Sequence, residues 1–379
     1  MQTTRYLIVG AGMTGDMAAK GIREHDADGR IVIVGADRHP VYKRPLLTKG
    51  LWQGAPEEKL WREPAADVDL VTGRRIVSLD LVGRRATDDA GEEYAWEKLL
   101  LATGARPREI PGADGVVWLR TLDDYRLVRE KATEGARFVV VGGGFIGSEI
   151  AAALLGAGVH VTMVFPEPGI GYRLFPAALS EFLVDYYREK GVEVLTDQTV
   201  GAASGTSVTL GDGRVLEADC VVAGLGVIPE TELAAAAGLE VEDGIVVDEY
   251  GRASGRDDVF AAGDVARFPV LALGISMRVE HEDHANTHGK LVGANMAGAA
   301  QPYDHLPFFY SDLFDLGYEA VGKVDSRLET VEDWQEPNRK GVVTYVEDGR
   351  PRGVLLWNVW DRVDDARDLL RSGEGSFVV

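Results

Sequence analysis

Two glycine-rich turns, each between an apolar run and a segment with helical spacing, constrain the fold more than any other feature of this chain. They read GAGMTG at residues 10–15 and GGGFIG at residues 142–147, and they follow the apolar runs 6–9 and 138–141. In a strand–turn–helix unit, glycines allow a tight turn, close approach of the backbone to a pyrophosphate, and close packing of the helix on its strand. The start of the helix adds unpaired N–H groups and the positive end of its dipole. Two such turns in one chain predict two dinucleotides that face each other, and therefore electron transfer between them.

The length and charge of the chain limit its architecture and its partners. With 379 residues it is too long for one ordinary core, and we expect two or three domains. Its 40 basic and 61 acidic residues give a formal net charge of −21. This negative field disfavours nucleic acids and anionic membrane surfaces as main partners.

The N-terminus and the cysteine content predict a cytoplasmic protein. The first strand is expected to begin at Arg5, which leaves no room for a signal or transit peptide, and no apolar stretch is long enough to span a bilayer. Cys220 is the single cysteine, so the chain can form neither an intramolecular disulfide nor a Cys-x-x-Cys redox pair. Its place in a valine-rich segment is typical of an inert core thiol.

Strands and helices alternate through most of the chain. We expect a strand at 5–9, a helix at 14–25 and a strand at 31–35, and the same order again from Thr121 to Val164. This alternation predicts parallel sheets with right-handed crossovers. A helix is expected at 178–190, a return to the first unit at 259–264, and a separate small α+β domain from Tyr303 that ends in a helix at 362–371.

Seven motifs occur in one order along the chain: GAGMTG at 10–15, RPLLTK at 44–49, LLATGARP at 100–107, GGGFIGSE at 142–149, VFAAGDVARF at 259–268, VEHEDHA at 279–285 and FFYSDL at 308–313. This set resembles the FAD-dependent NAD(P)H reductases of the ferredoxin-reductase and apoptosis-inducing-factor group, over nearly the whole chain. The segments at 165–169 and 310–326 are closer to the apoptosis-inducing-factor side. The resemblance implies a pyridine nucleotide-disulfide oxidoreductase-like fold without the redox disulfide.

The implied fold class is α/β, with two Rossmann-like dinucleotide-binding domains and a C-terminal α+β domain. The resemblance places the FAD-binding domain at 1–118 and 249–302, the NAD(H)-binding domain at 119–248 and the C-terminal domain at 303–379. A homodimer is a further possibility that the resemblance allows.

The resemblance assigns a set of residues to FAD. Asp37, after the second strand, is placed to accept the ribose hydroxyls, although it could be a solvated loop carboxylate. Asp264 matches the aspartate that binds the ribityl chain, although a Gly-Asp turn can be simple turn chemistry. Arg44 and Lys49 are expected along the flavin, where cationic donors stabilise reduced flavin. The full implied set is Gly10, Gly12, Met13, Thr14, Gly15, Asp37, Arg44, Lys49, Ala102, Thr103, Gly104, Arg120, Gly263, Asp264, Glu280 and His281.

A second set is assigned to NAD(H). The resemblance pairs Glu149 with Lys49 to position the nicotinamide, against the alternative of a surface salt bridge or no contact. Phe145 either stacks on the nicotinamide or packs its helix on the sheet. Glu167 replaces the usual strand-end acid as the ribose ligand and favours NADH, while nearby Arg173 leaves NADPH open. The full set is Gly142, Gly144, Phe145, Ile146, Gly147, Glu149, Glu167 and Gly226.

Three histidines, His281, His284 and His288, have helical spacing that could form a metal-binding face. No cysteine or carboxylate set completes such a site, and the resemblance instead places this helix under the flavin, so we predict no metal. Glu280, His281 and Tyr310 are then expected near the flavin ring, and Tyr310 stands where the family commonly has tryptophan. The predicted catalytic residues are Lys49, Glu149, His281 and Tyr310.

The loop from Lys43 to Leu51 has no cysteine, so electrons are expected to leave the flavin directly. The predicted reaction passes hydride from NADH to FAD and then electrons to an acceptor such as a ferredoxin. A redox-gated dimerising protein with a long-lived FADH2–NAD charge-transfer complex, and an NADH:quinone or diaphorase-type reductase, are the alternatives. Ferredoxins are usually acidic, so docking would need a basic patch, for which the arginine-containing pairs at 43–44, 74–75, 84–85 and 106/108 are candidates.

Overall fold

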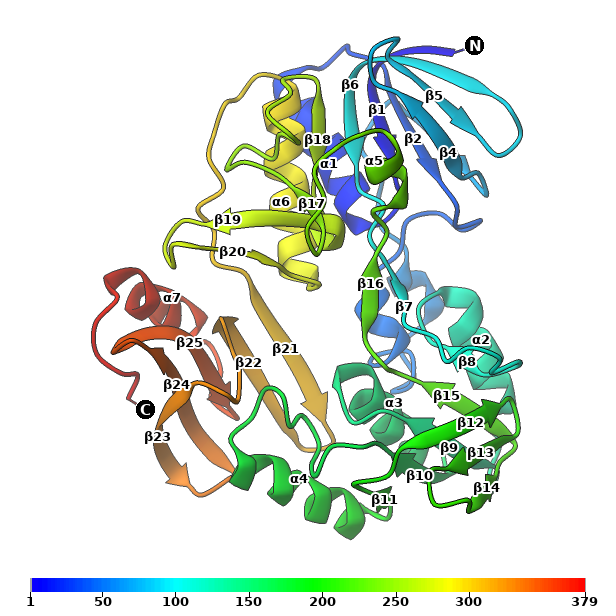
Figure 1. The fold of residues 1–379 in the computed structure, drawn as a ribbon, viewed down its shortest axis with the longest axis vertical. Helices are drawn as coiled ribbons and strands as arrows, with labels where there is room; N and C mark the ends of the chain where they lie inside the picture. The colour runs from blue at the N-terminus through cyan, green and yellow to red at the C-terminus, as the bar shows by residue number, and fades with distance from the viewer. Residues whose placement is uncertain (1, 379) are drawn as a thin grey trace. The chain divides into compact units, whose positions relative to one another are not determined.

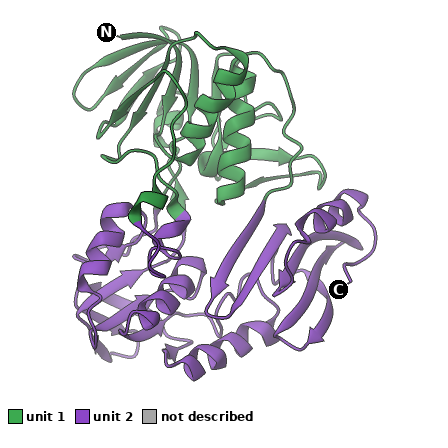
Figure 2. Cartoon of the chain, turned by 180° about the vertical axis from the view of Figure 1, so that it is seen from behind, with its two compact units in different colours: residues 1–44, 57–106, 228–307 green, residues 45–56, 107–227, 308–379 purple. Residues whose placement is uncertain are grey.

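The computed structural model describes residues 2–378 and contains two compact units, each built from three stretches of chain. Figure 2 colours residues 1–44, 57–106 and 228–307 as unit 1, and residues 45–56, 107–227 and 308–379 as unit 2. Each unit contains one of the two glycine-rich turns. Within residues 2–378, no helix is both long and apolar enough to cross a membrane.

Unit 1 is built on a seven-stranded sheet whose central strands are parallel (Figure 1). The order is β3-β2-β1-β6-β5-β4, and β18 pairs in parallel with the end of β6. These strands are β1 (Gln2–Val9), β2 (Ile31–Gly35), β3 (Val68–Thr72), β4 (Ile76–Asp80), β5 (Arg85–Asp88), β6 (Glu93–Leu101) and β18 (Val259–Ala261). The antiparallel β4 and β5 extend one side of the sheet.

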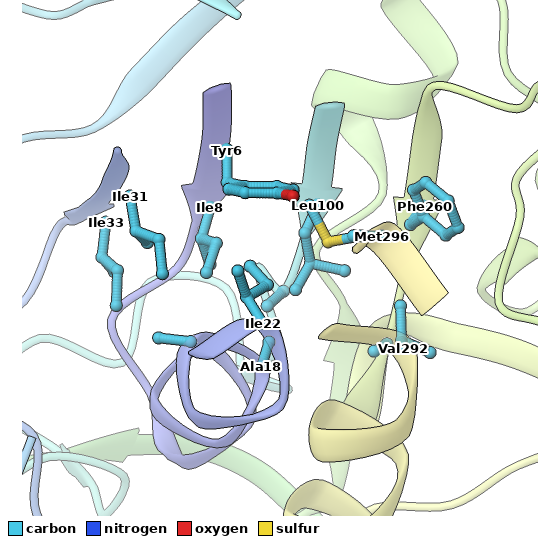
Figure 3. Packing of buried hydrophobic residues seen from close by; sticks show 13 residues of the cluster. Tyr6, Ile8, Ala18, Ile22, Ile31, Ile33, Leu100, Phe260, Val292 and Met296 are labelled. Carbon is cyan, nitrogen blue, oxygen red and sulfur yellow. The ribbon is translucent and has the colours of Figure 1, made fainter. Parts of the chain in front are cut away.

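Two helices, α1 (Met13–His25) and α6 (Glu282–Met296), cover one face of this sheet. Figure 3 shows Ile8 and Ile33 from the strands and Ile22 from α1 in one hydrophobic cluster, and all three side chains are buried. The helices approach closely because small residues meet at their crossing. A Cβ at Gly293 would lie 2.0 Å from the backbone oxygen of Ala18. This packing fixes α6 against the helix that follows the first glycine turn.

The rest of unit 1 consists of short elements around this sheet. A three-stranded sheet has the order β17-β19-β20. The elements are the 3-10 helices η2 (Glu57–Leu60) and η3 (Gly263–Val265), α5 (Glu232–Ala236), β17 (Ile245–Val246), β19 (Ala266–Val270) and β20 (Ile275–Arg278). The chain passes between the units five times. Three of these passages lie in the 3-10 helix η1 (Arg44–Leu47), in β7 (Ala105–Pro107) and in β16 (Val227–Pro229), and the other two follow residues 56 and 307.

Unit 2 contains a second parallel sheet, of order β11-β10-β9-β15-β8. Its strands are β8 (Val117–Trp118), β9 (Arg137–Val141), β10 (His160–Val164), β11 (Glu193–Leu195) and β15 (Cys220–Ala223). The helices are α2 (Leu122–Lys131), α3 (Phe145–Gly156) and α4 (Ala177–Lys190), and an antiparallel sheet joins β12 (Val200–Ser204), β13 (Ser207–Leu210) and β14 (Val215–Glu217). A capping box between Thr121 and Asp124 begins α2, and Gly191, at φ 109°, ends α4.

The C-terminal part of unit 2 is a five-stranded antiparallel sheet with one helix. The order is β21-β22-β25-β24-β23. The elements are β21 (Phe308–Leu313), β22 (Leu316–Gly322), β23 (Glu329–Glu336), β24 (Lys340–Glu347), β25 (Arg350–Trp357) and α7 (Val363–Ser372). Trp357 and Tyr345 are fully buried in this sheet.

The expected elements of both glycine-turn units are confirmed, with ends shifted by a few residues. The helices predicted at 14–25, 178–190 and 362–371 are α1, α4 and α7. The three histidines do not all lie on one helix as their spacing suggested, because His281 is the N-cap of α6 and precedes the helix. The three domain boundaries drawn from the sequence stay predictions, since the two compact units divide the chain differently.

Candidate functional site

The first glycine turn uses its three glycines for three different purposes. Gly10 has φ +122°, and a Cβ there would lie 2.1 Å from the backbone oxygen of Ala102. A Cβ at Gly15 would lie 2.1 Å from the backbone oxygen of Gly10, so this residue brings α1 onto its strand. Gly12 has no neighbouring atom within 4 Å of its ideal Cβ position. The middle glycine is therefore the one that leaves backbone open to a ligand.

The second glycine turn repeats this arrangement in unit 2. Gly142 has φ +115° and faces the backbone oxygen of Gly224, and a Cβ at Gly147 would lie 2.0 Å from the backbone oxygen of Gly142. Gly144 again has no atom within 4 Å of its ideal Cβ position. Phe165, fully buried at the end of β10, fills the space beside Gly143, so its ring supports the turn from inside.

Both helices that follow these turns lack a side-chain cap. Gly12 and Gly144 are the N-caps of α1 and α3, and neither can supply a side-chain acceptor to the first turn of its helix. The first N–H groups of a helix need acceptors, and phosphate oxygens provide them together with charge that suits the helix dipole. The open middle glycines and the uncapped helices fit the pyrophosphates of two dinucleotides.

Asp37 follows β2 and is held in one orientation. Its carboxylate accepts hydrogen bonds from the hydroxyl of Tyr42 at 2.8 Å and from the backbone N–H of His39 at 3.0 Å. The guanidinium of Arg44 lies over the Tyr42 ring at 5.4 Å. An ordered acid just beyond the second strand is the arrangement that ribose hydroxyls need, and this role for Asp37 stays a prediction.

The turn at Gly263 and Asp264 is fixed by contacts that the sequence did not suggest. The backbone N–H of Gly263 donates to Nδ1 of His288 at 3.4 Å. The guanidinium of Arg278 donates to the backbone oxygen of Asp264 at 3.3 Å and also pairs with the carboxylate of Glu280. Arg278 therefore joins the two acidic residues that were expected near FAD.

His284 and His288 form a buried pair beside the same turn. Both are fully buried, their ring centroids are 4.7 Å apart, and His284 stacks on Phe268 at 4.5 Å. Burial lowers the pKa of His288 to about 3 and, together with the neighbouring histidine, lowers the pKa of His284. Within residues 2–378 no group of three histidine, cysteine or acidic side chains could hold a metal ion.

Lys49 and Glu149, a hundred residues apart in sequence, form an ion pair in unit 2. Glu149 is 6% exposed and lies in the first turns of α3. Two hydroxyls complete its surroundings: Thr48 and Ser311 each donate to the carboxylate at 2.6 Å. The structure thus selects the buried pair over the surface salt bridge that the sequence left open.

Aromatic side chains surround this ion pair. The Tyr310 ring, 36% exposed, lies 5.1 Å from the Lys49 ammonium. Burial raises the pKa of Tyr187 and Tyr318 well above the ordinary value, and the Glu149 charge raises both further. Both phenols therefore stay neutral beside the carboxylate.

Phe145 packs against aromatic rings from the C-terminal sheet. Its ring centroid is 5.4 Å from that of Phe309, in an edge-to-face arrangement, and 6.4 Å from that of Tyr318. Phe145 therefore packs its helix against the C-terminal sheet, and stacking on a nicotinamide stays a prediction.

Glu167 and Arg173 pair with each other after β10. Arg173 Nη2 lies 2.9 Å from Glu167 Oε1, and the arginine side chain is 85% exposed. The acid expected to bind the NAD ribose is therefore accessible, and a cation that could face a 2′-phosphate lies beside it.

The remaining predicted residues are placed by backbone geometry. Ala102 closes against Gly10, and Thr103 donates to the backbone oxygen of Glu230 at 2.8 Å. Gly104 and Gly226 adopt φ +73° and +83°. The backbone N–H of Arg120 donates to Asp124 at 3.1 Å. Met13 and Thr14 begin α1, Ile146 lies in the first turn of α3, and His281 is the N-cap of α6.

Cys220 is buried, and arginines of two of the clusters are paired with carboxylates. Cys220 is buried in β15, and burial raises its pKa to about 11, which makes it a poor nucleophile at neutral pH. Among the clusters considered for docking, Arg84 pairs with Asp258 at 3.0 Å and Arg106 with Glu232 at 2.7 Å. These carboxylates offset the local positive charge.

Comparison with known proteins agrees with this geometry. The family model described as pyridine nucleotide-disulphide oxidoreductase matches residues 4–289, well over half of the chain. The chain belongs to this family. Within it, the ferredoxin-reductase and apoptosis-inducing-factor group is indicated by a second match, of residues 292–338, to the apoptosis-inducing factor, mitochondrion-associated, C-term model.

Individual members of the family cover nearly the whole chain. The ferredoxin–NAD(+) reductase component of the anthranilate 1,2-dioxygenase system of Burkholderia cepacia is 35% identical over 98% of this chain and 95% of its own length. Apoptosis-inducing factor 1, mitochondrial, of Dictyostelium discoideum is 30% identical over 97% of this chain and 78% of its own length. In the solved covalent complex of putidaredoxin reductase with putidaredoxin, the matching chain has a TM-score of 0.91, 29% identity, and coverage of 98% of this chain and 94% of its own.

Membership confirms the fold class and the enzyme class. The chain has two Rossmann domains and a C-terminal antiparallel domain, and it is an FAD-dependent NAD(P)H oxidoreductase of the ferredoxin-reductase type. Members of this family bind FAD and NAD(H). Sequence reasoning did not single out Thr48, Ser311 or Arg278 as parts of the site, although Thr48 and Ser311 lie within two of the quoted motifs. It considered His288 only as part of a possible metal-binding face and did not predict its contact with Gly263.

Proposed function

We propose that this protein transfers hydride from NADH to FAD and then passes electrons to a small iron–sulfur protein of the ferredoxin type. The observation that carries the proposal is the repeated glycine turn: each unit presents one open middle glycine at the start of an uncapped helix. One turn would receive the pyrophosphate of FAD and the other that of NADH. The 35% identity to a ferredoxin–NAD(+) reductase component supports the choice of acceptor.

The residues of unit 1 would hold FAD. Gly12 and the start of α1 would bind its pyrophosphate, Asp37 its ribose hydroxyls, and Asp264 its ribityl chain. When bound, FAD would accept hydride from the nicotinamide and release electrons to the acceptor. The protein itself would contribute alignment and charge, without acid–base chemistry on the substrate.

The residues of unit 2 would hold NADH. Gly144 and the start of α3 would bind its pyrophosphate, and Glu167 its adenosine ribose. The buried pair of Lys49 and Glu149 would orient the nicotinamide, because a fixed ion pair presents one charge pattern to the ring. An acid at the ribose favours NADH over NADPH by repelling a 2′-phosphate.

An acceptor of the ferredoxin type must approach a protein with a net charge of −21. Long-range repulsion from an acidic ferredoxin is screened within about 10 Å at 0.1 M salt. We therefore expect turnover with an acidic ferredoxin to rise when salt is added to a low-salt buffer, and turnover with a neutral quinone to be insensitive to salt.

The test is a sequential anaerobic stopped-flow experiment on the purified flavoprotein. Mixing with NADH is followed at the flavin absorbance, and a second mix adds ferredoxin, a quinone or oxygen. Rapid bleaching, with reoxidation faster by ferredoxin than by the quinone or oxygen, is the expected result. Absence of bleaching by both NADH and NADPH would refute the proposal.

A redox-gated dimerising protein is the second candidate, and it is favoured by the match of residues 292–338 to the apoptosis-inducing-factor C-terminal model. The same experiment separates the two. A slow bleach that leaves a long-wavelength band stable in oxygen, together with a shift from monomer to dimer in sedimentation velocity, would favour the second candidate. Equal rates with quinones and every ferredoxin would instead favour a diaphorase-type enzyme.

A further inference from the structure

Ser311 contacts the Glu149 carboxylate from a distant part of the chain. It lies on β21 of the C-terminal sheet, is fully buried, and donates to Oε1 of Glu149 at 2.6 Å. The ammonium of Lys49 donates to the same oxygen. Thr48 donates to the other oxygen, Oε2, at 2.6 Å. Three donors from two further segments therefore converge on one carboxylate.

The hydroxyls of Thr48 and Ser311 orient the Glu149 carboxylate, which the ion pair with Lys49 alone does not. A buried ionised carboxylate needs several donors, because it can accept at about four lone-pair positions and has lost its water. A single ammonium is a point charge with freely rotating donors and does not define the carboxylate plane. Hydroxyls bound to both oxygens fix the plane of Glu149, and therefore the direction from which Lys49 pairs with it.

The strand that carries Ser311 is itself held firmly. Ser311 pairs with Tyr318 in the antiparallel ladder of β21 and β22. The preceding residue, Tyr310, places its ring 5.1 Å from the Lys49 ammonium. Two neighbouring residues of β21 thus contact the two members of the ion pair: Ser311 contacts Glu149, and Tyr310 contacts Lys49.

We propose that Ser311, assisted by Thr48, is a positioning residue for hydride transfer. Its hydroxyl fixes the Glu149 carboxylate so that the Lys49–Glu149 pair keeps one orientation toward the nicotinamide. The role rests on the proposed function, since it concerns the same reaction. Ser311 acts through Glu149 and contributes no proton or electron of its own.

The consequence is a loss of rate without a loss of NADH affinity. Hydrogen bonds to charged groups are worth about a tenfold factor or more in an equilibrium, and small displacements of reacting groups cost comparable factors in rate. Ser311→Ala should lower the limiting rate of flavin reduction about tenfold, with the Kd for NADH within about twofold of wild type. Ser311→Thr keeps a hydroxyl and should recover most of the rate.

The experiment compares wild type, Ser311→Ala, Ser311→Thr and Thr48→Val by anaerobic stopped flow over a range of NADH concentrations. Thr344→Val is the matched control, because Thr344 is a fully buried hydroxyl of the same sheet that accepts from the backbone N–H of Phe377 instead of contacting Glu149. The second readout is infrared spectroscopy of the oxidised, nucleotide-free protein. The carboxylate stretch of Glu149 is identified as the band lost in Glu149→Gln, and it should shift in Ser311→Ala and stay unchanged in Thr344→Val.

The outcomes separate the two proposals. If NADH and NADPH both fail to reduce the wild-type flavin, the proposed function fails, whatever the infrared spectra show. If the wild type is reduced but Ser311→Ala keeps its limiting rate and its Glu149 band, the role of Ser311 is overturned. A raised Kd for NADH at an unchanged limiting rate would overturn it as well. If Ser311→Ala does not fold, Thr48→Val decides by the same criteria.

Discussion

Arg173 donates to Glu167 over 2.9 Å in the segment that follows β10, and Glu167 is the acid that we propose binds the adenosine ribose of NADH. The guanidinium is 85% exposed and the carboxylate 26% exposed, so a ligand can compete for either partner. Exposed ion pairs of this kind are weak, at about 0.2–1 kcal/mol, and are easily exchanged. We therefore expect a single substitution in this pair to shift the preference between NADH and NADPH.

Removing the cation should increase the preference for NADH. We expect Arg173→Ala to raise the ratio of kcat/KM for NADH to that for NADPH by about fivefold, because a 2′-phosphate would lose the countercharge that Arg173 could offer. Glu167→Lys should lower the same ratio by at least as much. The control is Arg327→Ala, which removes another highly exposed arginine, paired with Asp325 at 2.6 Å. An unchanged ratio in Glu167→Lys would show that the ribose contact has been assigned wrongly.

Alanine substitutions in the glycine turns should impair ligand binding at the middle glycine and folding at the third glycine. Gly12→Ala meets no atom within 4 Å, so the protein should fold but retain less FAD after purification. Gly144→Ala should keep its flavin and raise the KM for NADH, by about tenfold if one phosphate contact is lost. Flavin content and steady-state kinetics measure these effects.

The third glycine of each turn should behave differently. A methyl group at Gly15 or Gly147 would lie 2.1 Å or 2.0 Å from a backbone oxygen, so alanine there should lower stability before it alters any ligand. Thermal melting of the four variants provides the comparison. Equal melting temperatures for Gly12→Ala and Gly15→Ala would contradict this division.

His288 makes the stability of unit 1 depend on pH. Its folded pKa is lowered by burial to about 3 from an ordinary 6.5, so between these values the unfolded chain binds the extra proton. The contribution of His288 to the free energy of unfolding is therefore fully present above pH 6.5. Below that pH the free energy of unfolding falls by about 1.4 kcal/mol per pH unit for one such histidine. Denaturant midpoints from pH 7 to pH 4.5 should fall less steeply in His288→Gln. His160→Gln, at an exposed histidine outside the buried pair, is the control.

Asp16 forms a buried ion pair that should matter for folding. It is 1% exposed and accepts from Arg62 at 2.7 Å and from Lys20 at 3.0 Å. Arg62→Leu leaves this buried carboxylate with Lys20 as its only remaining partner in the pairings above, so it should lower the free energy of unfolding by about 2 kcal/mol. Arg84→Ala, at an exposed ion pair with Asp258, should cost less than about 1 kcal/mol. Comparable losses in the two variants, measured by urea unfolding, would argue against a structural role for the Asp16 pair.

The local elements of the fold could be predicted because their signals are local. The run before Gly10 is apolar at every position from Tyr6 to Val9, and these residues form a strand buried between parallel neighbours. The glycine spacing fixed the strand-to-helix turns for the same reason, since a positive φ at Gly10 and Gly142 is a property of a single residue. The pairing of Lys49 with Glu149 came from family resemblance and not from spacing.

The composition of the site beyond that pair could not be predicted. Ser311 lies 162 residues from Glu149, and a serine in a strand gives no local sign of the partner its hydroxyl will find. His284 and His288 looked like one face of a helix, and only the packing of Phe268 and the Gly263 turn showed that they are buried and neutral. The arginine clusters were candidates for a basic docking patch, but the fold pairs Arg84 with Asp258 and Arg106 with Glu232.

The sequence alone therefore determined the two dinucleotide-binding turns, the parallel architecture around them and the absence of an intramolecular disulfide, since each depends on residue type and short-range spacing. The tertiary structure decided which groups surround Glu149, which histidines are buried, and which arginines are offset by acids. These features depend on contacts between segments far apart in the chain. Their energies come from burial and hydrogen bonding, which exist only after the chain has folded.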